Sequence, residues 1–229
     1  MEFKKLPFDR CAEAEGVIVV IDVLRAFTTA AYAFSRGAAG IIPVATLDQA
    51  FALREKCPDL LLMGEEQWHP IPGFNFGNSP AALMQADLDR RWLVQRTSAG
   101  TQGLMQFPSA EALFAASFVC AKATVRAITA LQPEVVSFIL TGTLHGAPAE
   151  EDEACADYMA ALFTDDSSDP TPWLARVGSS YAGQKFLDPE SGHYAPQDVA
   201  LCATVDHFPF AMRAVSVEGI MALQAVSAS

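Results

Sequence analysis

The stretch VIVVID, residues 17–22, places five aliphatic side chains in succession and ends in an acid. An uninterrupted apolar run of this length is typical of a strand that is buried on both faces of a sheet. The segment that follows, about 24–36, predicts a helix that ends at Gly37, because glycine is common just beyond helix ends. A doubly buried strand that leads into a helix indicates an α/β protein with parallel strands.

The same alternation of short apolar runs and helical segments continues to about residue 163. Further strands are predicted at 40–45, 59–64, 92–96, 112–118 and 135–142, and further helices at 79–86, 101–107, 119–131 and 151–163. Thr46 and Gln49 form a capping box at the start of the helix that follows the second strand. The pattern predicts a layered α/β/α sandwich with a largely parallel or mixed sheet.

The chain has 229 residues, and we expect one α/β domain over 1–229. The segment TDDSSDPTP, residues 164–172, lacks periodicity and predicts a surface loop at which a subdomain break can fall. Beyond it the pattern is less regular. Residues 208–217 predict one more strand, which Pro209 would favour at an edge of the sheet because proline cannot donate to the ladder.

The formal net charge is −12, which argues against nucleic acid as a partner, because such binding depends on Lys and Arg neutralising phosphates. The same charge argues against an anionic membrane surface. No apolar run is long enough to span a bilayer, and the N-terminal segment has no signal-peptide core, so we expect a cytoplasmic protein. The five cysteines contain no CxxC pair and predict neither a zinc site nor a disulfide framework. A small anionic substrate and homo-oligomerisation are both compatible with this composition.

Polar residues follow several of the predicted strands, at the point where each strand ends. Asp22 and Arg25 follow the first, Glu65 follows the third, TSAGT (97–101) follows the fourth, and TGTLHGAPAEEDEAC (141–155) follows the sixth. In open α/β sheets, ligands bind beyond the carboxyl ends of the strands. If the strands are parallel, these loops meet at one edge of the sheet and form a site.

Each of these residues also has a purely structural interpretation. Asp22 can cap the following helix or pair with Arg25, and Ser79 can cap a helix that has Pro80 at its first position. Gly100 can serve a tight turn at positive φ, or the TSAGT loop can direct hydroxyl and N–H groups at an oxyanion. The acidic run 150–153 suits the dipole of a helix start, although its spacing also allows two carboxylates to enter one site.

Clustered carboxylates repel one another, and a hard divalent cation relieves that repulsion. Oxygen ligands favour Mg²⁺, so we expect Mg²⁺ bound by some of Asp22, Glu65, Glu151 and Asp152. The chain contains neither the GxxxxGK[ST] loop of P-loop ATPases nor a GxGxxG dinucleotide fingerprint. A site that combines Mg²⁺, an arginine and a Ser/Thr/Gly loop is suited to a phosphate group.

The chain resembles the 2-phosphosulfolactate phosphatase family of the coenzyme M biosynthetic route, from about residue 17 to 160 and more faintly in APQDVALCATVDHF (195–208). The resemblance rests on these segments, in this order: VIDVLRA (20–26), GAAGIIPVAT (37–46), GE (64–65), GFNFGNSP (73–80), TSAGT (97–101), SF (117–118) and ED…CA (151–156). It implies an Mg²⁺-dependent phosphatase that converts 2-phospho-3-sulfolactate to sulfolactate and phosphate. Matched position by position, it implies catalytic roles for Asp22 and Arg25, metal binding by Asp22, Glu65, Glu151 and Asp152, and substrate binding by Asn78, Ser79, Thr97, Gly100 and Thr101.

Three positions depart from the pattern of the family. Ala99 replaces an asparagine, Gln102 replaces an arginine, and Cys120 replaces a second asparagine. The loss of a charge-assisted hydrogen bond costs about 1.5–3 kcal/mol, so we expect weaker activity on the sulfonate ester than on another phosphorylated 2-hydroxy acid. The alternative is a non-catalytic protein that binds small anions and has kept the phosphatase fold.

The sequence leaves the chemical route open. A carboxylate can take a proton from an attacking water, or a side chain can attack phosphorus first. Asp22 suits either role, with Ser79 and Thr97 as alternative nucleophiles.

Overall fold

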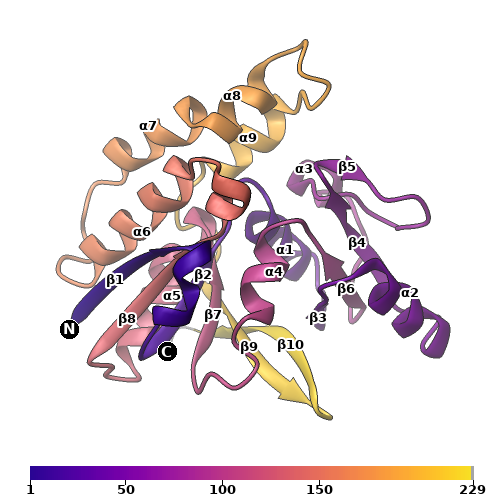
Figure 1. Ribbon diagram of the computed structural model, residues 1–229, viewed down its shortest axis with the longest axis horizontal. Coiled ribbons are helices and arrows are strands. Elements are labelled where there is room, and N and C mark those ends of the chain that lie inside the picture. Colours follow the sequence, from indigo (N-terminus) through magenta and orange to yellow (C-terminus); the bar gives the residue numbers. More distant parts are fainter. Residues whose placement is uncertain (228–229) are drawn as a thin grey trace.

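The computed structural model describes residues 1–227, apart from the side chains of residues 143 and 145. Within these residues ten strands form one sheet in the order β1-β8-β2-β7-β9-β10-β3-β6-β4-β5 (Figure 1). The strands are β1 (Glu2–Pro7), β2 (Val17–Ile21), β3 (Gly40–Pro43), β4 (Leu61–Glu66), β5 (His69–Pro70), β6 (Trp92–Arg96), β7 (Leu113–Ala116), β8 (Val135–Leu140), β9 (Phe210–Val217) and β10 (Ile220–Ser227).

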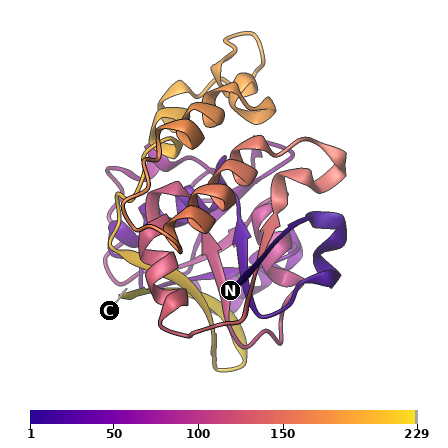
Figure 2. The same ribbon diagram turned by 90° about the vertical axis from the view of Figure 1, so that its left-hand side faces the viewer.

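Nine α-helices and three short 3₁₀ segments connect the strands within the described chain. The helices are α1 (Ala26–Ser35), α2 (Leu47–Lys56), α3 (Pro80–Leu83), α4 (Gly100–Met105), α5 (Ala121–Thr129), α6 (Glu150–Leu162), α7 (Thr171–Ser179), α8 (Tyr181–Leu187) and α9 (Pro196–Cys202), and the 3₁₀ segments are η1 (Phe8–Glu13), η2 (Phe118–Cys120) and η3 (Thr141–Gly146). None of the helices in residues 1–227 is long and apolar enough to cross a membrane. Figure 2 shows the orange helices that follow α6 stacked at one end of the molecule.

The sheet contains two parallel groups of strands. Strands β1, β8, β2 and β7 pair in parallel, and so do β3, β6 and β4. The antiparallel hairpin β9–β10 lies between the two groups and is joined to them by short ladders, two register pairs to β7 and one to β3. The sheet is therefore mixed, and the prediction of an α/β sandwich with a largely parallel or mixed sheet is confirmed.

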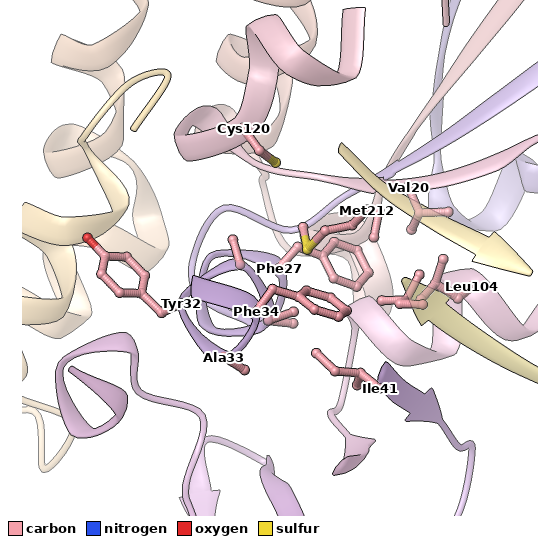
Figure 3. Close-up of a cluster of buried hydrophobic side chains, with 14 of the residues drawn as sticks. Val20, Phe27, Tyr32, Ala33, Phe34, Ile41, Leu104, Cys120 and Met212 are labelled. Carbon is pink, nitrogen blue, oxygen red and sulfur yellow. The ribbon is translucent and has the colours of Figure 1, made fainter. Parts of the chain in front are cut away.

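The first predicted strand is buried on both faces, because its side chains alternate between two hydrophobic cores. Ile18 and Val20 pack into the core that contains α1 and α4, and Val19 and Ile21 pack into the core that contains α5 and α6. Figure 3 shows Val20 beside Phe27, Phe34 and Leu104 in the first of these cores. The continuous apolar run of the sequence therefore has the structural cause expected from it.

Local signals placed several helix ends correctly. Thr46 and Gln49 form the predicted capping box of α2, and Ser79 caps α3 with Pro80 at the first helical position. Gly37 follows α1 with φ +95°, in the left-handed region that glycine adopts without steric penalty. Helix α3 ends at Leu83, three residues earlier than expected.

The strand predicted at 208–217 is present as β9, but the prediction that it lies at an edge of the sheet was wrong. Strand β9 lies inside the sheet, paired with β7 on one side and with β10 on the other. Pro209 stands just before the strand begins at Phe210, so its missing N–H group removes no hydrogen bond from the ladder. The patterns of β1, β10 and helices α7–α9 were not recognised in the sequence.

Residues 163–170 connect α6 to α7, and they include most of the predicted loop 164–172. Asp165 and Asp169 accept hydrogen bonds from residues two positions further on, which is typical of tight turns. Helix α7 packs back against α6, so this loop leads into the helices that cover the carboxyl ends of the strands. The possible subdomain break at this loop stays a prediction.

Candidate active site

A cavity of about 230 Å³ lies where strands β2, β4, β6 and β8 end. The loops after these strands and the beginning of α6 form part of its wall. Side chains of α8 (Tyr181–Leu187) form the rest. It is lined by Asp22, Leu24, Arg25, Glu65, Trp68, Asn78, Ser98, Ala99, Gly142, Leu144, Ala147, Pro148, Glu151, Asp152, Tyr181, Ala182, Lys185 and Phe186. Strands β2 and β8 belong to one parallel group and β4 and β6 to the other, so the sheet turns between the groups and brings both sets of strand ends together.

Asp22 directly follows β2, where it both accepts a hydrogen bond from the start of α1 and lines the cavity. Its Oδ1 accepts a hydrogen bond of 2.8 Å from the N–H of Ala26, the first residue of α1, so the capping interpretation holds for this oxygen. The side chain nevertheless lines the cavity and is buried. Burial raises the pKa of Asp22 to about 6, although the N–H of Ala26 opposes the rise, and the charge of Glu65 adds to it.

Glu151 and Asp152 enter the cavity from the first turn of α6. Asp152 accepts hydrogen bonds of 2.9 Å from the N–H groups of Val23 and Gly142, which fixes the loops after β2 and β8 against the helix. Burial and the nearby charges of Glu151 and Asp22 hold the pKa of Asp152 well above its usual range. Burial also raises the pKa of Glu151 to about 7, and its Oε2 is buried without a hydrogen-bond partner among the described residues.

Glu65 has both oxygens engaged by the neighbouring loops. Its Oε1 accepts a hydrogen bond of 2.5 Å from the N–H of Ser98, and its Oε2 accepts bonds from the Ser98 hydroxyl and the N–H of Trp68. Glu65 therefore holds the loop after β6 against the turn after β4. The indole of Trp68 is placed in the cavity wall by this arrangement.

The sequence allowed an ion pair between Arg25 and Asp22, but the structure does not show one. Its Nη1 instead contacts Oδ2 of Asp198 on α9 at 2.5 Å, and its guanidinium lies 4.2 Å from the ring centre of Phe186. Oδ1 of Asp198 accepts hydrogen bonds from the Ser79 hydroxyl and from the N–H of Ala81. One buried carboxylate thus orients the arginine and ties it to the start of α3.

We expect Asp198→Asn to lower kcat/KM by about 10- to 100-fold, because Arg25 loses its charged anchor while the amide oxygen can still bond Ser79 and Ala81. A rise in KM with a smaller fall in kcat would indicate a positioning role. Steady-state kinetics and melting temperature check this expectation.

Asp206→Asn is the matched control, since Asp206 accepts a hydrogen bond of 2.6 Å from Tyr158 and does not line the cavity. It should lower the melting temperature without lowering kcat/KM. If Asp198→Asn behaves like this control, the ion pair with Arg25 serves stability alone.

The structure brings six of the predicted site residues to the cavity wall, and four lie beside it. Those in the wall are Asp22, Arg25, Glu65, Asn78, Glu151 and Asp152. Ser79 is engaged with Asp198, and Thr97 and Thr101 bond each other, with the N–H of each donating to the hydroxyl of the other at 2.9 and 3.0 Å. These three hydroxyl residues therefore support the wall, and Ser98 and Ala99 are the members of the TSAGT loop that line it.

Gly100 is required for a reason other than positive φ. The residue begins α4, and a Cβ added to it would come within 2.7 Å of both Asp22 Oδ2 and the Cβ of Ala26. Of the two alternatives left open for this loop, the turn with Gly100 at positive φ does not hold, because the constraint on Gly100 is the close approach of α4 to the end of β2. Through this contact Gly100 leaves room for the carboxylate of Asp22.

Of the three departures from the family pattern, Ala99 lines the cavity and the other two do not. The side-chain amide of Gln102 donates to the backbone oxygens of Ala45 and Thr97. Cys120 is fully buried in the core beside α1. The expected loss of activity on a sulfonate ester therefore rests on Ala99.

Several residues of the cavity were missed in the sequence. Asp198 lies within the segment 195–208 that resembles the family, and its position in that segment was the available signal. Trp68, Tyr181, Lys185 and Phe186 stand in stretches without recognised periodicity. The turn after β4 brings Trp68 to the cavity, and the packing of α8 over the strand ends brings the other three.

The donor atoms of the cavity fit Mg²⁺ bound by few protein ligands. Among residues 1–227, no group of three or more His, Cys, Asp or Glu side chains is arranged to hold a metal ion. Mg²⁺, however, usually keeps several waters and binds one or two carboxylates together with substrate phosphate. Glu151, with an unpartnered buried oxygen, and Asp22 are the residues with capacity for it, whereas Glu65 and Asp152 have both oxygens occupied by N–H or hydroxyl donors.

Buried acids with raised pKa values beside an anchored arginine, in one cavity at the strand ends, are typical of an enzyme active site for a small anionic substrate. The fold and the site thus define an α/β enzyme of this kind. The profile of the 2-phosphosulpholactate phosphatase family matches residues 6–215. The chain belongs to this family, and its class is that of the phosphoric monoester hydrolases.

Relatives with the name "Probable 2-phosphosulfolactate phosphatase" occur in several bacteria. The Bacillus subtilis protein is 32% identical over 186 residues, which cover 80% of each chain. The Deinococcus radiodurans protein is 38% identical over 185 residues, which cover 78% of this chain and 76% of the relative. The Thermotoga maritima protein is 41% identical over 107 residues, which cover 47% of this chain and 46% of the relative.

Proposed function

We propose that this protein is an Mg²⁺-dependent phosphatase that hydrolyses a small phosphorylated 2-hydroxy acid, similar to 2-phosphosulfolactate, to the hydroxy acid and phosphate. The observation that supports it most is the convergence of Asp22, Glu151 and Asp152 with Arg25 on one cavity. The names of the relatives support the same substrate class. A volume of about 230 Å³ suits a substrate of this size.

In this proposal Arg25 binds the phosphoryl group. Its guanidinium is held by Asp198 on one side and by the ring of Phe186 on another, so little side-chain freedom remains to be lost when it donates to phosphoryl oxygens. Its Nε is buried without a partner among the described residues and adds an unused donor. Arg25 thereby orients the phosphorus toward the end of β2.

Asp22 is the proposed catalytic carboxylate. Oδ1 is occupied by the N–H of Ala26, which fixes the rotation of the side chain, and Oδ2 lies beside Gly100 at the start of α4. A pKa raised to about 6 makes the carboxylate a better proton acceptor near neutral pH than an ordinary aspartate. Both the water route and the covalent route remain compatible with this geometry.

Asp22 and Glu151 would hold Mg²⁺, while Glu65 and Asp152 keep the surrounding loops in place. When bound, the ion would neutralise charge on the phosphoryl oxygens and polarise the phosphorus centre. Asn78, whose Oδ1 is buried without a partner among the described residues, lies in the same wall and offers its amide to the substrate.

The test is a phosphate-release screen of small phosphomonoesters with Mg²⁺ and with EDTA. We expect turnover of phosphorylated 2-hydroxy acids in Mg²⁺ and its loss in EDTA, with recovery when Mg²⁺ is restored. Ca²⁺ in place of Mg²⁺ serves as a control for general ionic effects. Binding of these esters without turnover in any divalent metal would favour the alternative, a non-catalytic protein for small anions.

A further inference from the structure

Lys185 lines the cavity from α8. It has no part in the roles proposed above. Its Nζ lies 4.6 Å from the ring centre of Trp68 and 4.6 Å from that of Tyr181. Two aromatic faces hold an ammonium group by cation–π attraction without neutralising its charge. The position of this charge is therefore defined, and the charge remains available to a ligand.

The two cations of the cavity wall differ in how they are paired. Arg25 forms a salt bridge with the buried Asp198, whereas none of the salt bridges found in residues 1–227 involves Lys185. A lysine that lines a cavity in a chain of net charge −12 would find a carboxylate easily if its purpose were stability. A cavity-lining ammonium group that forms none of these salt bridges points to an anionic ligand.

A pair of aromatic rings separates these two cations. The guanidinium of Arg25 stacks on Phe186, Phe186 packs against Trp68 with ring centres 5.3 Å apart, and the ammonium of Lys185 stacks on Trp68. This arrangement places two positive charges along one wall, with the rings of Phe186 and Trp68 between them. It matches a substrate with two anionic groups on a short carbon skeleton.

We propose that Lys185 binds the second anionic group of the substrate, a carboxylate or a sulfonate, while Arg25 and the acids bind the phosphoryl group. The proposal rests on the proposed function and names the residue that recognises the acid group of its substrate. Lys185 is then a specificity residue, which selects among phosphomonoesters and takes no part in breaking the P–O bond.

Three phosphate esters of alcohols CH₃–CH(OH)–X test this proposal, in which X is a carboxylate, a CH₂–sulfonate or a neutral carboxamide. We expect Lys185→Gln to lower kcat/KM about 10- to 100-fold on the charged esters, the range for loss of a charge-assisted hydrogen bond, and to leave the carboxamide ester unchanged. Lys185→Arg should restore most of the activity. The charged ester whose kcat/KM falls further in Lys185→Gln identifies the anion that Lys185 prefers.

Lys56→Gln is the matched control, because this exposed lysine of α2 carries the same charge outside the cavity. An equal loss on all three esters would overturn the proposal, since Lys185 would then act on the phosphoryl group or on the fold. No loss on any ester would overturn it as well.

Binding of 3-sulfolactate, measured by calorimetry, separates this proposal from the proposed function. If the wild type hydrolyses none of the esters, the proposed function fails. The subsite is still supported when Lys185→Gln weakens sulfolactate binding tenfold or more and Lys56→Gln does not. Equal affinity of wild type and Lys185→Gln would overturn the subsite.

Discussion

Asp22→Asn is expected to reduce kcat by about 10²- to 10⁴-fold, the range for loss of a general base, while the protein stays folded. The amide oxygen of asparagine can still accept the hydrogen bond from Ala26 N–H that Oδ1 accepts in the wild type. The substitution removes a buried negative charge beside Glu65 and Glu151, so repulsion within the cavity decreases. Stability and turnover should therefore change independently, which phosphate release and the melting temperature measure directly.

Asp48→Asn is the control for this substitution, because Asp48 stands near a helix start, in the first turn of α2, but is exposed and does not line the cavity. It should leave kcat unchanged. A wild-type rate from Asp22→Asn would mean that Asp22 only caps α1, and the proposed mechanism would lose its central residue.

Glu151→Gln is expected to stabilise the metal-free protein and to abolish its response to Mg²⁺. The folded pKa of Glu151, about 7, lies above the ordinary value near 4.5. Between these values the folded state holds more protons than the unfolded state, so the free energy of unfolding falls as pH rises through this window. Glutamine carries no charge and avoids this loss, and we expect a gain of about 1–3 kcal/mol at pH 8 in EDTA and almost none near pH 4.5.

Thermal unfolding at several pH values, with EDTA and with Mg²⁺, measures this effect. The wild type should gain melting temperature from Mg²⁺ most strongly above pH 7, where Glu151 has released its proton, and the variant should gain little and lose turnover. Glu150→Gln is the control on the same helical turn, since the side chain of Glu150 does not line the cavity. An Mg²⁺ response in Glu151→Gln equal to that of the wild type would exclude Glu151 as a ligand.

Much of the fold was predictable because its causes are local or periodic. The run at 17–21 is apolar at every position because both faces of β2 meet a core. The N-terminal ends of α2 and α3 were predictable because capping side chains within the first turn determine them. The position of β9 was not predictable in this way. Its place between β7 and β10 depends on which strands find partners across the sheet, and Pro209 alone pointed to the wrong answer.

The site divides along the same boundary. The sequence itself places Asp22, Glu65, Glu151 and Asp152 at strand or helix ends, which is where open α/β sheets bind ligands. Because three antiparallel pairings separate β2 from β4, only the tertiary structure decided that these acids meet in one cavity. Only the tertiary structure decided which carboxylate oxygens accept hydrogen bonds from backbone N–H groups. Asp152, for example, accepts such a bond from Val23, 129 positions away in the chain. The tertiary structure also decided that Arg25 is paired with Asp198, 173 positions away, and that the ammonium group of Lys185 lies over the ring of Trp68. Contacts of this range follow from the packing of α6, α8 and α9 over the strand ends, and such packing leaves no periodic pattern in the residues that make it.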